Sequence, residues 1–585
     1  MSVLETIRMI ARTSAALPEI LSRRRNVDLM LDRCAEAHPN LTAIAYLDER
    51  VSFRELRERA DQYARFFADQ GIGKGDRVVL TMDNRPDFLF IFHGLQRLGA
   101  IAALINTNLT GIPLAHVVRI AEAKLFVFGS EHAAKLDALA KDIPELDLAK
   151  DVWIQQEVAD AKLFGARSLN DAVDSMSNRR LPLLPFHGRE HCAYIYTSGT
   201  TGLPKAAVMA HDRVTGAGTL AGHALHRVSP GQLIYICLPL YHSNALMLGW
   251  IASLATGSGI ALRRKFSASE FFRDIRVFDA KSFVYVGELC RYLVNSPPEE
   301  GERNHQLHAC TGNGMRPDVW ETFQKRFGVP VVREIYGATE GTTTLVNLSG
   351  RPGMVGKIAP GMAVVICDLE SGVPLRNANG FCEKVASGET GLLLGAINQY
   401  ATFDGYLDRK ASSDKVIWDV FKPGDSFFNT GDLIKLHHGR WLSFVDRVGD
   451  TFRWKGENVS TNEVGEVVNA GPGVIETNVY GVEITGCEGR AGMASIRVSE
   501  TFDPNALARF VADQLPAFQR PLFIRVTTDE IEITGTFKHQ KVKARKQRFD
   551  PDQVGEPLYY LAKNEYLPID HAVFRTIESG EIRPG

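Results

Sequence analysis

The sequence predicts an α/β protein whose large N-terminal part contains parallel sheets and whose smaller C-terminal part is α+β. Between residues 42 and 337, short apolar segments typical of buried strands alternate with amphipathic helical segments. Such alternation is typical of parallel sheets covered by helices on both faces. The composition also indicates a folded protein, because 45% of the 585 residues are apolar and 23% are charged, as in ordinary globular domains.

The first series of elements begins with a predicted strand at 42–47 and a helix that follows it. Ser52 and Glu55 have the spacing of a capping box, and the apolar residues between Phe53 and Phe67 recur with helical periodicity. Further buried strands of this series are predicted at 77–82, 100–106 and 124–129.

A polar, proline-rich stretch near 175–187 separates this series from a second one. The second series contains five apolar segments that we predict to be buried strands, at 192–197, 233–240, 259–265, 282–287 and 331–337. The two series predict two packed α/β lobes.

The pattern changes after residue 344. Residues 344–445 contain short strand-like segments between many Gly, Pro and Asn residues, which predicts a β-rich subdomain. From about residue 450 we predict a small α+β unit, with helices at 461–469 and 503–514 and strands at 478–484 and 493–498. The predicted parts are an amphipathic N-terminal helix (1–26), a large domain (27–448) and a small, mobile C-terminal domain (449–585) that begins at Gly449–Asp450.

Charge and cysteine content exclude several classes of protein. The net charge of −2 provides no global field that would recruit nucleic acid, so any bound anion must be held by a local site. The eight cysteines are scattered and form no CxxC pair, which indicates reduced thiols in a cytoplasmic protein and neither a disulfide framework nor a zinc site. The sequence does not predict an oligomeric state.

Residues 1–26 leave two roles open. Charged residues at positions 5, 8 and 12 interrupt the apolar stretch that a secretory signal needs. The predicted helix either packs on its own domain or contacts the inner face of an anionic membrane peripherally. The most apolar segment elsewhere, Phe88–Ile105, contains three strongly polar side chains, so we predict no membrane-spanning helix.

The most specific motif is Tyr196–Lys205, YTSGTTGLPK, directly after a predicted strand. Glycine lets backbone N–H groups approach a phosphate, hydroxyls donate hydrogen bonds and lysine supplies positive charge. Neither a Walker loop nor a GxGxxG fingerprint occurs in the chain. We therefore predict a polyphosphate site made by Thr197, Ser198, Gly199, Thr200, Thr201, Gly202 and Lys205.

This motif resembles the signature of the adenylate-forming superfamily, which contains acyl-CoA synthetases, luciferases and the adenylation domains of peptide synthetases. Tyr336–Glu340 (YGATE) and Thr430–Asp432 (TGD) are similar to further blocks of that superfamily, in the same order. Four segments resemble its branch of fatty-acid transport proteins and very-long-chain acyl-CoA synthetases, namely 285–293, 312–320, 444–464 and 534–541. The resemblance extends over residues 27–585.

The resemblance implies a ligase that forms acyl-adenylate and pyrophosphate from a fatty acid and ATP, and then acyl-CoA and AMP. ATP, Mg²⁺ and CoA are the implied cofactors. Because a carboxylate must approach the α-phosphorus of ATP, the site has to neutralise charge and align the attack. Glu340 is the implied magnesium ligand and Thr339 the implied partner of the α-phosphate. The implied adenine and ribose site contains Gly312, Asn313, Gly314, Tyr336, Gly337, Asp432 and Arg447.

The resemblance also implies roles in the C-terminal part. Lys538 is the implied adenylation lysine, but Phe537 stands where most of the superfamily has glycine, so Lys541 is a rival. Asp450, beside Gly449, matches the hinge about which the small domain rotates between the two half-reactions. The implied CoA channel is lined by Lys455, Gly456, Glu457 and Asn458.

The sequence indicates the residues that would bind the acyl group less clearly. His242 either lies near the carboxylate and guards the pantetheine channel or is a core residue, and 245–257 either lines an acyl tunnel or is plain core.

We predict a long-chain or very-long-chain fatty acyl-CoA synthetase. The alternatives are a ligase for a bile-acid-like, carnitine-like or aromatic acid, an uptake protein that acts by CoA trapping, an enzyme that loads a carrier protein or oxidises its adenylate, and a carrier without chemistry. The last needs no phosphate clamp, so Lys205, Glu340 and Lys538 argue against it.

Overall fold

The computed structural model describes residues 26–158, 160–197, 203–398, 401–455, 457–529, 531 and 541–584. The chain divides into two compact units. The first contains Met1–Gly353 and Thr402–Lys415, and the second contains Met354–Ala401 and Val416–Gly585. The helix predicted for 1–26 lies outside the described residues except for Asn26. The boundary predicted at Gly449–Asp450 falls within the second unit and stays a prediction.

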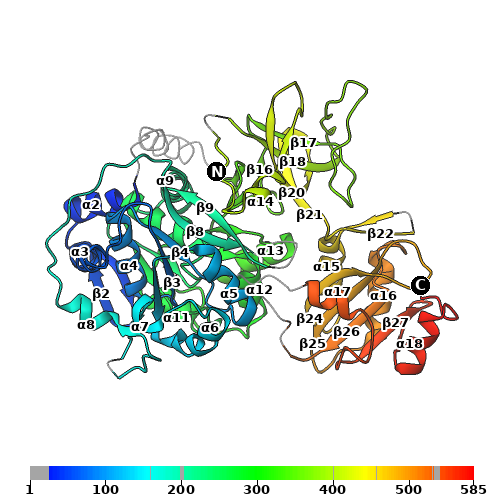
Figure 1. The fold of residues 1–585 in the computed structure, drawn as a ribbon. Coiled ribbons are helices and arrows are strands. Elements are labelled where there is room, and N and C mark those ends of the chain that lie inside the picture. Colours follow the sequence, from blue (N-terminus) through cyan, green and yellow to red (C-terminus); the bar gives the residue numbers. More distant parts are fainter. Residues whose placement is uncertain are drawn as a thin grey trace. The chain divides into compact units, whose positions relative to one another are not determined.

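The first unit contains a seven-stranded sheet that ends in the predicted phosphate segment (Figure 1). Its strands are parallel, except that the last two are paired antiparallel. The order is β7 (Arg167–Ser168), β6 (Val152–Gln155), β5 (Leu125–Gly129), β3 (Arg77–Thr81), β4 (Ile101–Leu104), β8 (His191–Thr197) and β9 (Lys205–Ala210).

An eight-stranded sheet forms the second layer of the first unit. Its inner strands are parallel, and the edge pairs β1–β2 and β14–β15 are antiparallel. The order is β15 (Thr344–Asn347), β14 (Val332–Gly337), β13 (Ala309–Asn313), β12 (Ser282–Val286), β10 (Leu233–Ile236), β11 (Gly259–Leu262), β1 (Thr42–Tyr46) and β2 (Glu49–Ser52).

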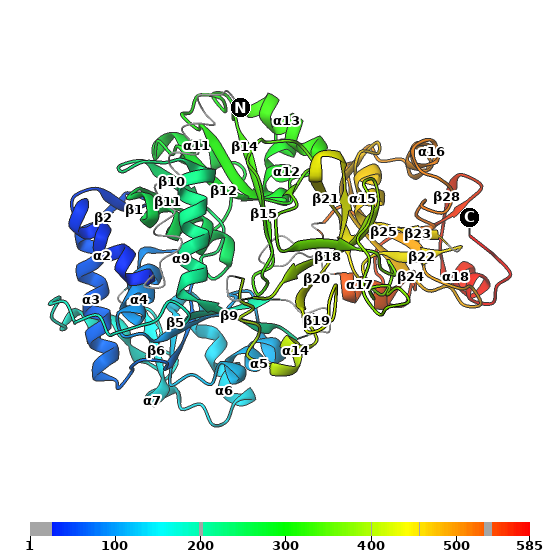
Figure 2. The same cartoon turned by 90° about the horizontal axis from the view of Figure 1, so that it is seen from above.

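Helices pack on these two sheets, and Figure 2 shows α9 between them. The capping box predicted at Ser52 and Glu55 is present at the start of α3. The α-helices are α2 (Val27–Ala37), α3 (Phe53–Asp69), α4 (Pro86–Arg97), α5 (Gly111–Ala121), α6 (Leu136–Asp142), α7 (Leu148–Asp151), α8 (Leu169–Asp174), α9 (His211–Leu220), α10 (Ala252–Thr256), α11 (Phe271–Val277), α12 (Gly287–Asn295), α13 (Pro317–Phe327) and α14 (Arg409–Ser413). A 3₁₀ helix, η1 (Ser130–Lys135), and two π-helices, η2 (Ala221–His226) and η3 (Asn244–Ile251), complete the set.

The second unit begins with an antiparallel β subdomain, as the many Gly, Pro and Asn residues of 344–445 predict. The order is β16 (Gly356–Lys357), β21 (Trp441–Arg447), β20 (Ser426–Leu436), β18 (Thr390–Ala396) and β17 (Met362–Val365), and β19 (Val416–Trp418) pairs with β20. The 3₁₀ turn η4 (His438–Arg440) joins β20 to β21.

The remainder of the second unit is α+β with a core of its own. A hairpin of β22 (Phe452–Trp454) and β23 (Glu457–Val459) precedes a sheet of β24 (Val474–Val482), β25 (Ala491–Val498), β26 (Phe523–Thr527), β27 (Leu558–Ala562) and β28 (Glu565–Pro568). The helices are α15 (Thr461–Asn469), α16 (Pro504–Gln514), α17 (Lys541–Gln547) and α18 (His571–Glu578).

Two expectations can be compared with the residues that the structure describes. All eight cysteines are free thiols, and seven of them are buried. Among the residues that the structure describes, none of the helices combines the length and the apolar character needed to cross a bilayer.

Candidate active site

The predicted phosphate segment connects two antiparallel strands in the first unit. Thr197 ends β8, Lys205 begins β9, and these two residues are register partners. Ser198, Gly199, Thr200, Thr201 and Gly202 lie outside the described residues. The carbonyl of Pro204 accepts a hydrogen bond from Nε2 of His116 on α5, at 3.1 Å, so α5 holds the backbone directly before Lys205.

Residues 338–341 follow β14 and bring Glu340 to the same region. The Oε1 atom of Glu340 accepts a hydrogen bond of 2.5 Å from the hydroxyl of Tyr406. The ammonium of Lys205 lies 5.9 Å from the centre of the Tyr406 ring, within the range of a cation–π contact. A cation and a carboxylate that are 135 positions apart in the sequence therefore share one tyrosine.

Arg213, on α9, fixes the backbone around Glu340. Its Nη2 donates to the carbonyls of Ala338, at 2.9 Å, and Gly341, at 2.5 Å. Its Nη1 lies 4.0 Å from Asp404. The turn that carries Glu340 is therefore held at both ends by one guanidinium.

Three other predicted blocks meet in this unit. The hydroxyls of Ser243 and Thr339 are 3.4 Å apart, and Nδ2 of Asn244 donates to Oδ1 of Asn313 at 2.8 Å. The ring of His242 packs against that of Tyr241, with centroids 4.6 Å apart. The 241–244 block thus links the turn that carries Thr339 to the 312–314 loop.

The predicted base-binding loop, 312–314, rests on a buried carboxyl group. Oε1 of Glu334 accepts hydrogen bonds from the N–H of Met315, at 2.7 Å, and the hydroxyl of Tyr285, at 3.3 Å. Complete burial raises the pKa of the Glu334 carboxyl to about 8, because the charged form is poorly solvated there. Glu334 is therefore mostly protonated at neutral pH.

The loop's two glycines serve different purposes. A Cβ on Gly312 would lie 2.0 Å from the carbonyl oxygen of Tyr285 on the neighbouring strand, so this glycine permits β12 and β13 to pair closely. Gly314 has a φ of +77° and open space around it. Tyr336 and Gly337 end β14, and Gly337 is exposed.

In the second unit, the predicted ribose groups face each other across β20 and β21. Asp432 and Arg447 are register partners, and Nε of Arg447 lies 3.6 Å from Oδ1 of Asp432. The Arg447 side chain is 49% exposed and that of Asp432 is 11% exposed. The structure therefore brings together two residues that are fifteen positions apart in the sequence.

The predicted hinge is held by the helix that follows the adenylation-lysine segment. Gly449 has a φ of +85°, a conformation that favours glycine. One carboxylate oxygen of Asp450 lies 2.7 Å from Nη2 of Arg545, and the other lies 3.5 Å from Nζ of Lys541. The Lys541 ammonium also donates to the hydroxyl of Thr461 at 2.8 Å. Lys541, the rival for the adenylation role, is thus engaged at the hinge, and Lys538 lies outside the described residues.

The predicted CoA residues lie at the β22–β23 hairpin. Lys455 is exposed at its tip with a φ of +52°, Gly456 lies outside the described residues, and Glu457 and Asn458 are exposed on β23. Glu457 and Asn458 are the register partners of Trp454 and Arg453.

The sequence of this chain matches the model of the AMP-binding enzyme family over residues 31–407. The chain belongs to the AMP-binding enzyme family. It is 38% identical to long-chain fatty acid transport protein 2 of Rattus norvegicus over 558 residues, which cover 93% of this chain and 89% of that protein. It is also 38% identical to the medium/long-chain-fatty-acid–CoA ligase FadD6 of Mycobacterium tuberculosis over 527 residues, 89% of this chain and 86% of that protein.

Solved structures confirm the predicted fold class of this AMP-binding enzyme. The anthranilate CoA ligase AuaEII in complex with anthranoyl-AMP superposes with a TM-score of 0.75 at 21% identity, covering 90% of this chain and 98% of that one. ATP-bound MatB from Rhodopseudomonas palustris superposes with a TM-score of 0.74 at 23% identity, covering 90% of this chain and 99% of that one. At these identities the likeness shows the fold alone.

Glu340 suits the magnesium ion that this enzyme family uses. Mg²⁺ binds through one or two carboxylates together with substrate phosphates and keeps several waters. Glu340 is only partly buried, and Tyr406 bonds Oε1, so among the contacts of the described residues Oε2 would be the oxygen offered to the ion. A second cluster, Asp83, Glu131 and His132, also has its ligand atoms within 4.8 Å of one another. Lys265 and Arg264 lie within 4 Å of Asp83 and Arg85 within 4 Å of Glu131, so this cluster is an ion-pair network.

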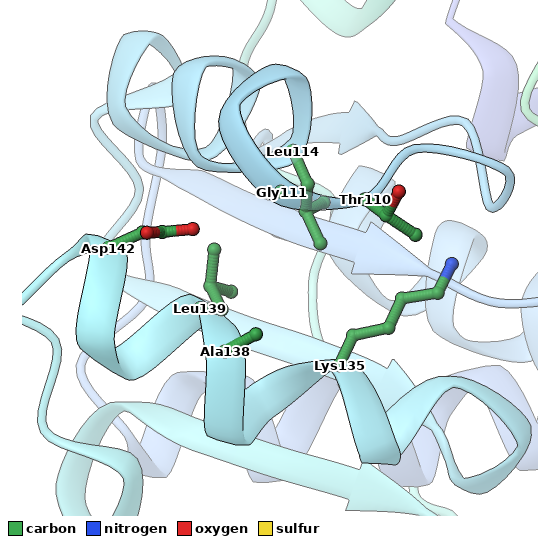
Figure 3. A pocket seen from close by; sticks show the side chains of 7 residues that line it. All are labelled: Thr110, Gly111, Leu114, Lys135, Ala138, Leu139 and Asp142. Carbon is green, nitrogen blue, oxygen red and sulfur yellow. The ribbon is translucent and has the colours of Figure 1, made fainter.

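A separate cavity of about 170 Å³ lies between the first turn of α5 and the η1–α6 segment (Figure 3). Its lining is almost entirely apolar, and the ammonium of Lys135 at its edge donates to the carbonyls of Thr107 and Leu109. None of the predicted site residues lines it. The lining residues are Thr110, Gly111, Leu114, Lys135, Ala138, Leu139 and Asp142.

Sequence reasoning missed three residues of the first unit's site: Tyr406, Arg213 and Glu334. Glu334 carried a signal, because it is a carboxylate in the apolar strand VVREIYG and lies on the same strand face as Tyr336. Tyr406 and Arg213 carried none, because their partners are brought to them by the pairing of distant segments.

Proposed function

We propose that this AMP-binding enzyme is an ATP-dependent long-chain or very-long-chain fatty acyl-CoA synthetase. The observation that carries the proposal is the sharing of Tyr406 by Lys205 and Glu340. A lysine and a carboxylate that both contact one tyrosine provide the two kinds of group that a magnesium–triphosphate complex requires, a cation for phosphate and an oxygen ligand for the metal. The relatives named as long-chain fatty acid transport protein and fatty-acid–CoA ligase support the choice of acid.

The reaction has two steps. A carboxylate oxygen of the fatty acid attacks the α-phosphorus of ATP, and the bond from that phosphorus to the pyrophosphate oxygen breaks. The sulfur of CoA then attacks the acyl carbon, the bond from that carbon to the AMP oxygen breaks, and the thiol proton is released. Both steps develop negative charge, so preorganised donors accelerate them.

The first unit supplies the groups for the first step. Residues Thr197 to Lys205 bind the β- and γ-phosphates, and Thr339 bonds the α-phosphate. Glu340 would hold the magnesium ion, which neutralises phosphate charge when bound. The ring of Tyr336 stacks on adenine, and the 312–314 loop, linked to Asn244 at 2.8 Å, accommodates the edge of the base. His242 lies near the acyl carboxylate.

The second unit supplies the ribose, hinge and CoA groups. Asp432 and Arg447 bond the ribose diol, since a carboxylate accepts and a guanidinium donates. Lys538 is the adenylation lysine, which is supported by the engagement of Lys541 with Asp450 and Thr461. Gly449 and Asp450 form the hinge. Lys455, Gly456, Glu457 and Asn458 line the CoA channel.

The test is a panel of carboxylic acids assayed for AMP release with and without CoA. Palmitate and longer fatty acids should give AMP and the corresponding acyl-CoA. Aromatic, carnitine-like and bile-acid-like acids should give less, and an acyl-carrier protein should not replace CoA. Release of ADP in place of AMP, or fatty-acid binding without any nucleotide turnover, contradicts the proposal.

We also propose that residues 1–26 mediate a peripheral contact with anionic membranes. The alternation of apolar with basic residues in this segment supports it, because an amphipathic basic helix binds anionic lipid surfaces. Sedimentation with vesicles of phosphatidylserine and phosphatidylcholine should retain the full chain and not a chain that begins at Val27. Equal retention of both contradicts this role.

A further inference from the structure

The segment Thr402–Lys415 lies in the first unit although the chain on both sides of it belongs to the second. It is attached to β9, the strand that starts with Lys205. The N–H of Val208 donates to the carbonyl of Gly405, and the N–H of Leu407 donates to the carbonyl of Ala206, both at 3.0 Å. The backbone of Tyr406 is thus fixed beside the strand that carries the phosphate-binding lysine.

The Tyr406 side chain then contacts two of the predicted site residues at once. Its hydroxyl donates to Oε1 of Glu340 at 2.5 Å, and its ring lies 5.9 Å from Nζ of Lys205. Lys205 lies on β9, Glu340 lies in the turn after β14, and Tyr406 lies in the segment Thr402–Lys415. The fold therefore brings together three residues that are distant in the sequence. The hydroxyl of Tyr406 is partly buried, which strengthens a hydrogen bond to a charged acceptor.

The surroundings make this contact rigid. Asp404, two residues before Tyr406, lies 4.0 Å from Arg213, and Arg213 holds the carbonyls of Ala338 and Gly341 on either side of Glu340. The segment Thr402–Lys415 and the turn that carries Glu340 are therefore connected twice, once through Arg213 and once through the Tyr406 hydroxyl. Within the described ranges, the hydrogen bond that the Glu340 carboxylate accepts from Tyr406 is made at Oε1, and Oε2 is the oxygen that would bind a metal ion.

We propose that Tyr406 is a positioning residue for the nucleotide site, which orients the Glu340 carboxylate so that Oε2 binds the magnesium ion of MgATP and which supports Lys205 with its ring. This inference rests on the proposed function. Carboxylates that bind metals are usually oriented by a further hydrogen bond, and loss of such a bond costs about 10–100-fold in metal affinity or activity. Tyr406 acts through Glu340 and Lys205 and touches no reacting atom.

The first test is Tyr406→Phe, which keeps the ring and removes the hydroxyl. ATP binding is measured by calorimetry at a series of magnesium concentrations and in EDTA. The magnesium concentration that gives half of the full enhancement of ATP binding should be roughly 10–100-fold higher for the variant than for the wild type. In EDTA, where no free magnesium is present, the variant should bind ATP with the same affinity as the wild type. Tyr559→Phe, a partly buried tyrosine of β27 in the second unit, is the matched control and should behave as wild type.

A double-mutant cycle separates positioning from a merely structural role. If Tyr406 acts through Glu340, Tyr406→Phe should cause no further loss in a Glu340→Gln background. Tyr406→Leu removes the ring as well, and it should also weaken ATP binding in EDTA, because Lys205 loses its aromatic partner. Thermal unfolding of each variant shows whether it is folded.

The inference is overturned if Tyr406→Phe has the magnesium dependence of the wild type, or if the two substitutions are additive. These outcomes are distinct from failure of the proposed function. If wild-type protein binds MgATP but forms no AMP with any fatty acid, the proposed function fails while the binding measurements still decide the role of Tyr406.

Discussion

The site residues of the first unit are fixed in a different way from those of the second. In the first unit, the predicted residues sit on paired strands and are braced by short hydrogen bonds among partly or fully buried groups, such as Glu334 with Met315 and Tyr406 with Glu340. In the second unit, the predicted residues are held by ion pairs in which at least one partner is partly or largely exposed, such as Asp432 with Arg447 and Asp450 with Arg545.

This contrast suits the two halves of the proposed reaction. A buried network is expensive to break, because every unsatisfied group costs about 1–3 kcal/mol. Solvent that reaches one or both partners screens an ion pair, and fully exposed pairs contribute only about 0.2–1 kcal/mol each, so these pairs should cost less to exchange than the buried hydrogen bonds. We therefore expect the predicted site residues of the first unit to be held rigidly and those of the second unit to exchange their ion pairs more readily.

The largest expected effect concerns the two lysines around the start of α17. Lys538→Ala should reduce adenylation by about 10²–10³-fold, because a preorganised donor to developing charge is lost. Lys541→Ala should reduce it far less, because Lys541 is engaged with Thr461 and Asp450. ATP–pyrophosphate exchange measures adenylation in both variants, and transfer from supplied acyl-AMP to CoA measures the second step.

The opposite result would reassign the role. If Lys541→Ala abolishes exchange and Lys538→Ala does not, Lys541 is the adenylation lysine. Gly456→Phe is the complementary variant. It should retain exchange and lose transfer to CoA, because it would fill the proposed pantetheine channel.

The next largest effect concerns the buried carboxyl group under the 312–314 loop. Glu334→Ala removes the acceptor of the Met315 N–H, while the Tyr285 hydroxyl keeps the carbonyl of Arg333 at 3.3 Å, so it should lower the unfolding free energy by about 1–3 kcal/mol for the one buried N–H that is left unsatisfied. It should also raise the KM for ATP, since the loop loses its support. Glu334→Gln keeps an acceptor and is neutral, so it should remain close to wild type in both measurements at pH 7.

Glu334 also predicts a pH dependence of stability. Its pKa rises from 4.5 in the unfolded chain to about 8 in the folded protein, so between these values the folded state binds more protons. The contribution of Glu334 to stability is therefore fully present below pH 4.5 and is lost as the pH rises towards 8. Thermal unfolding from pH 5 to pH 9 should show a smaller decline for Glu334→Gln than for wild type, and identical curves would contradict the burial argument.

The smallest expected effect concerns the hinge. Asp450→Asn removes the carboxylate that Arg545 and Lys541 share, and it should lower the unfolding free energy by about 1 kcal/mol or less. Because 1 kcal/mol corresponds to about a fivefold change in an equilibrium, the ratio of the two half-reaction rates should shift severalfold. Glu578→Gln is the control, because its pair with Arg548 has nearly the same exposure, 26% and 28%. If the ratio of the two half-reaction rates is unchanged in Asp450→Asn, the ion pairs of Asp450 do not influence the balance between the half-reactions.

Much of the fold was predictable because it depends on local patterns. The capping box at Ser52, the strand at 282–286 and the helix at 461–469 follow from spacing and periodicity within a few residues. The segment 402–415 was not predictable, because its attachment to β9 depends on backbone pairing that no local pattern reveals.

The same reasoning explains what was found and missed in the site. Asp432 and Arg447 were predicted from motifs, and their cross-strand pairing places them together. Tyr406 was missed because its aromatic side chain, in the sequence DGYLDR, looks like an ordinary turn residue. Its proposed role follows only from the contacts that it makes with Lys205 and Glu340 in the structure.

The most direct test of the central claim follows the oxygen atoms of the acid. Palmitate labelled with ¹⁸O in its carboxylate is incubated with the enzyme, ATP, Mg²⁺ and CoA, and the products are analysed by mass spectrometry. If the carboxylate oxygen attacks the α-phosphorus, each AMP should carry one ¹⁸O and the pyrophosphate none. Unlabelled AMP, or ADP with labelled phosphate, would contradict the account.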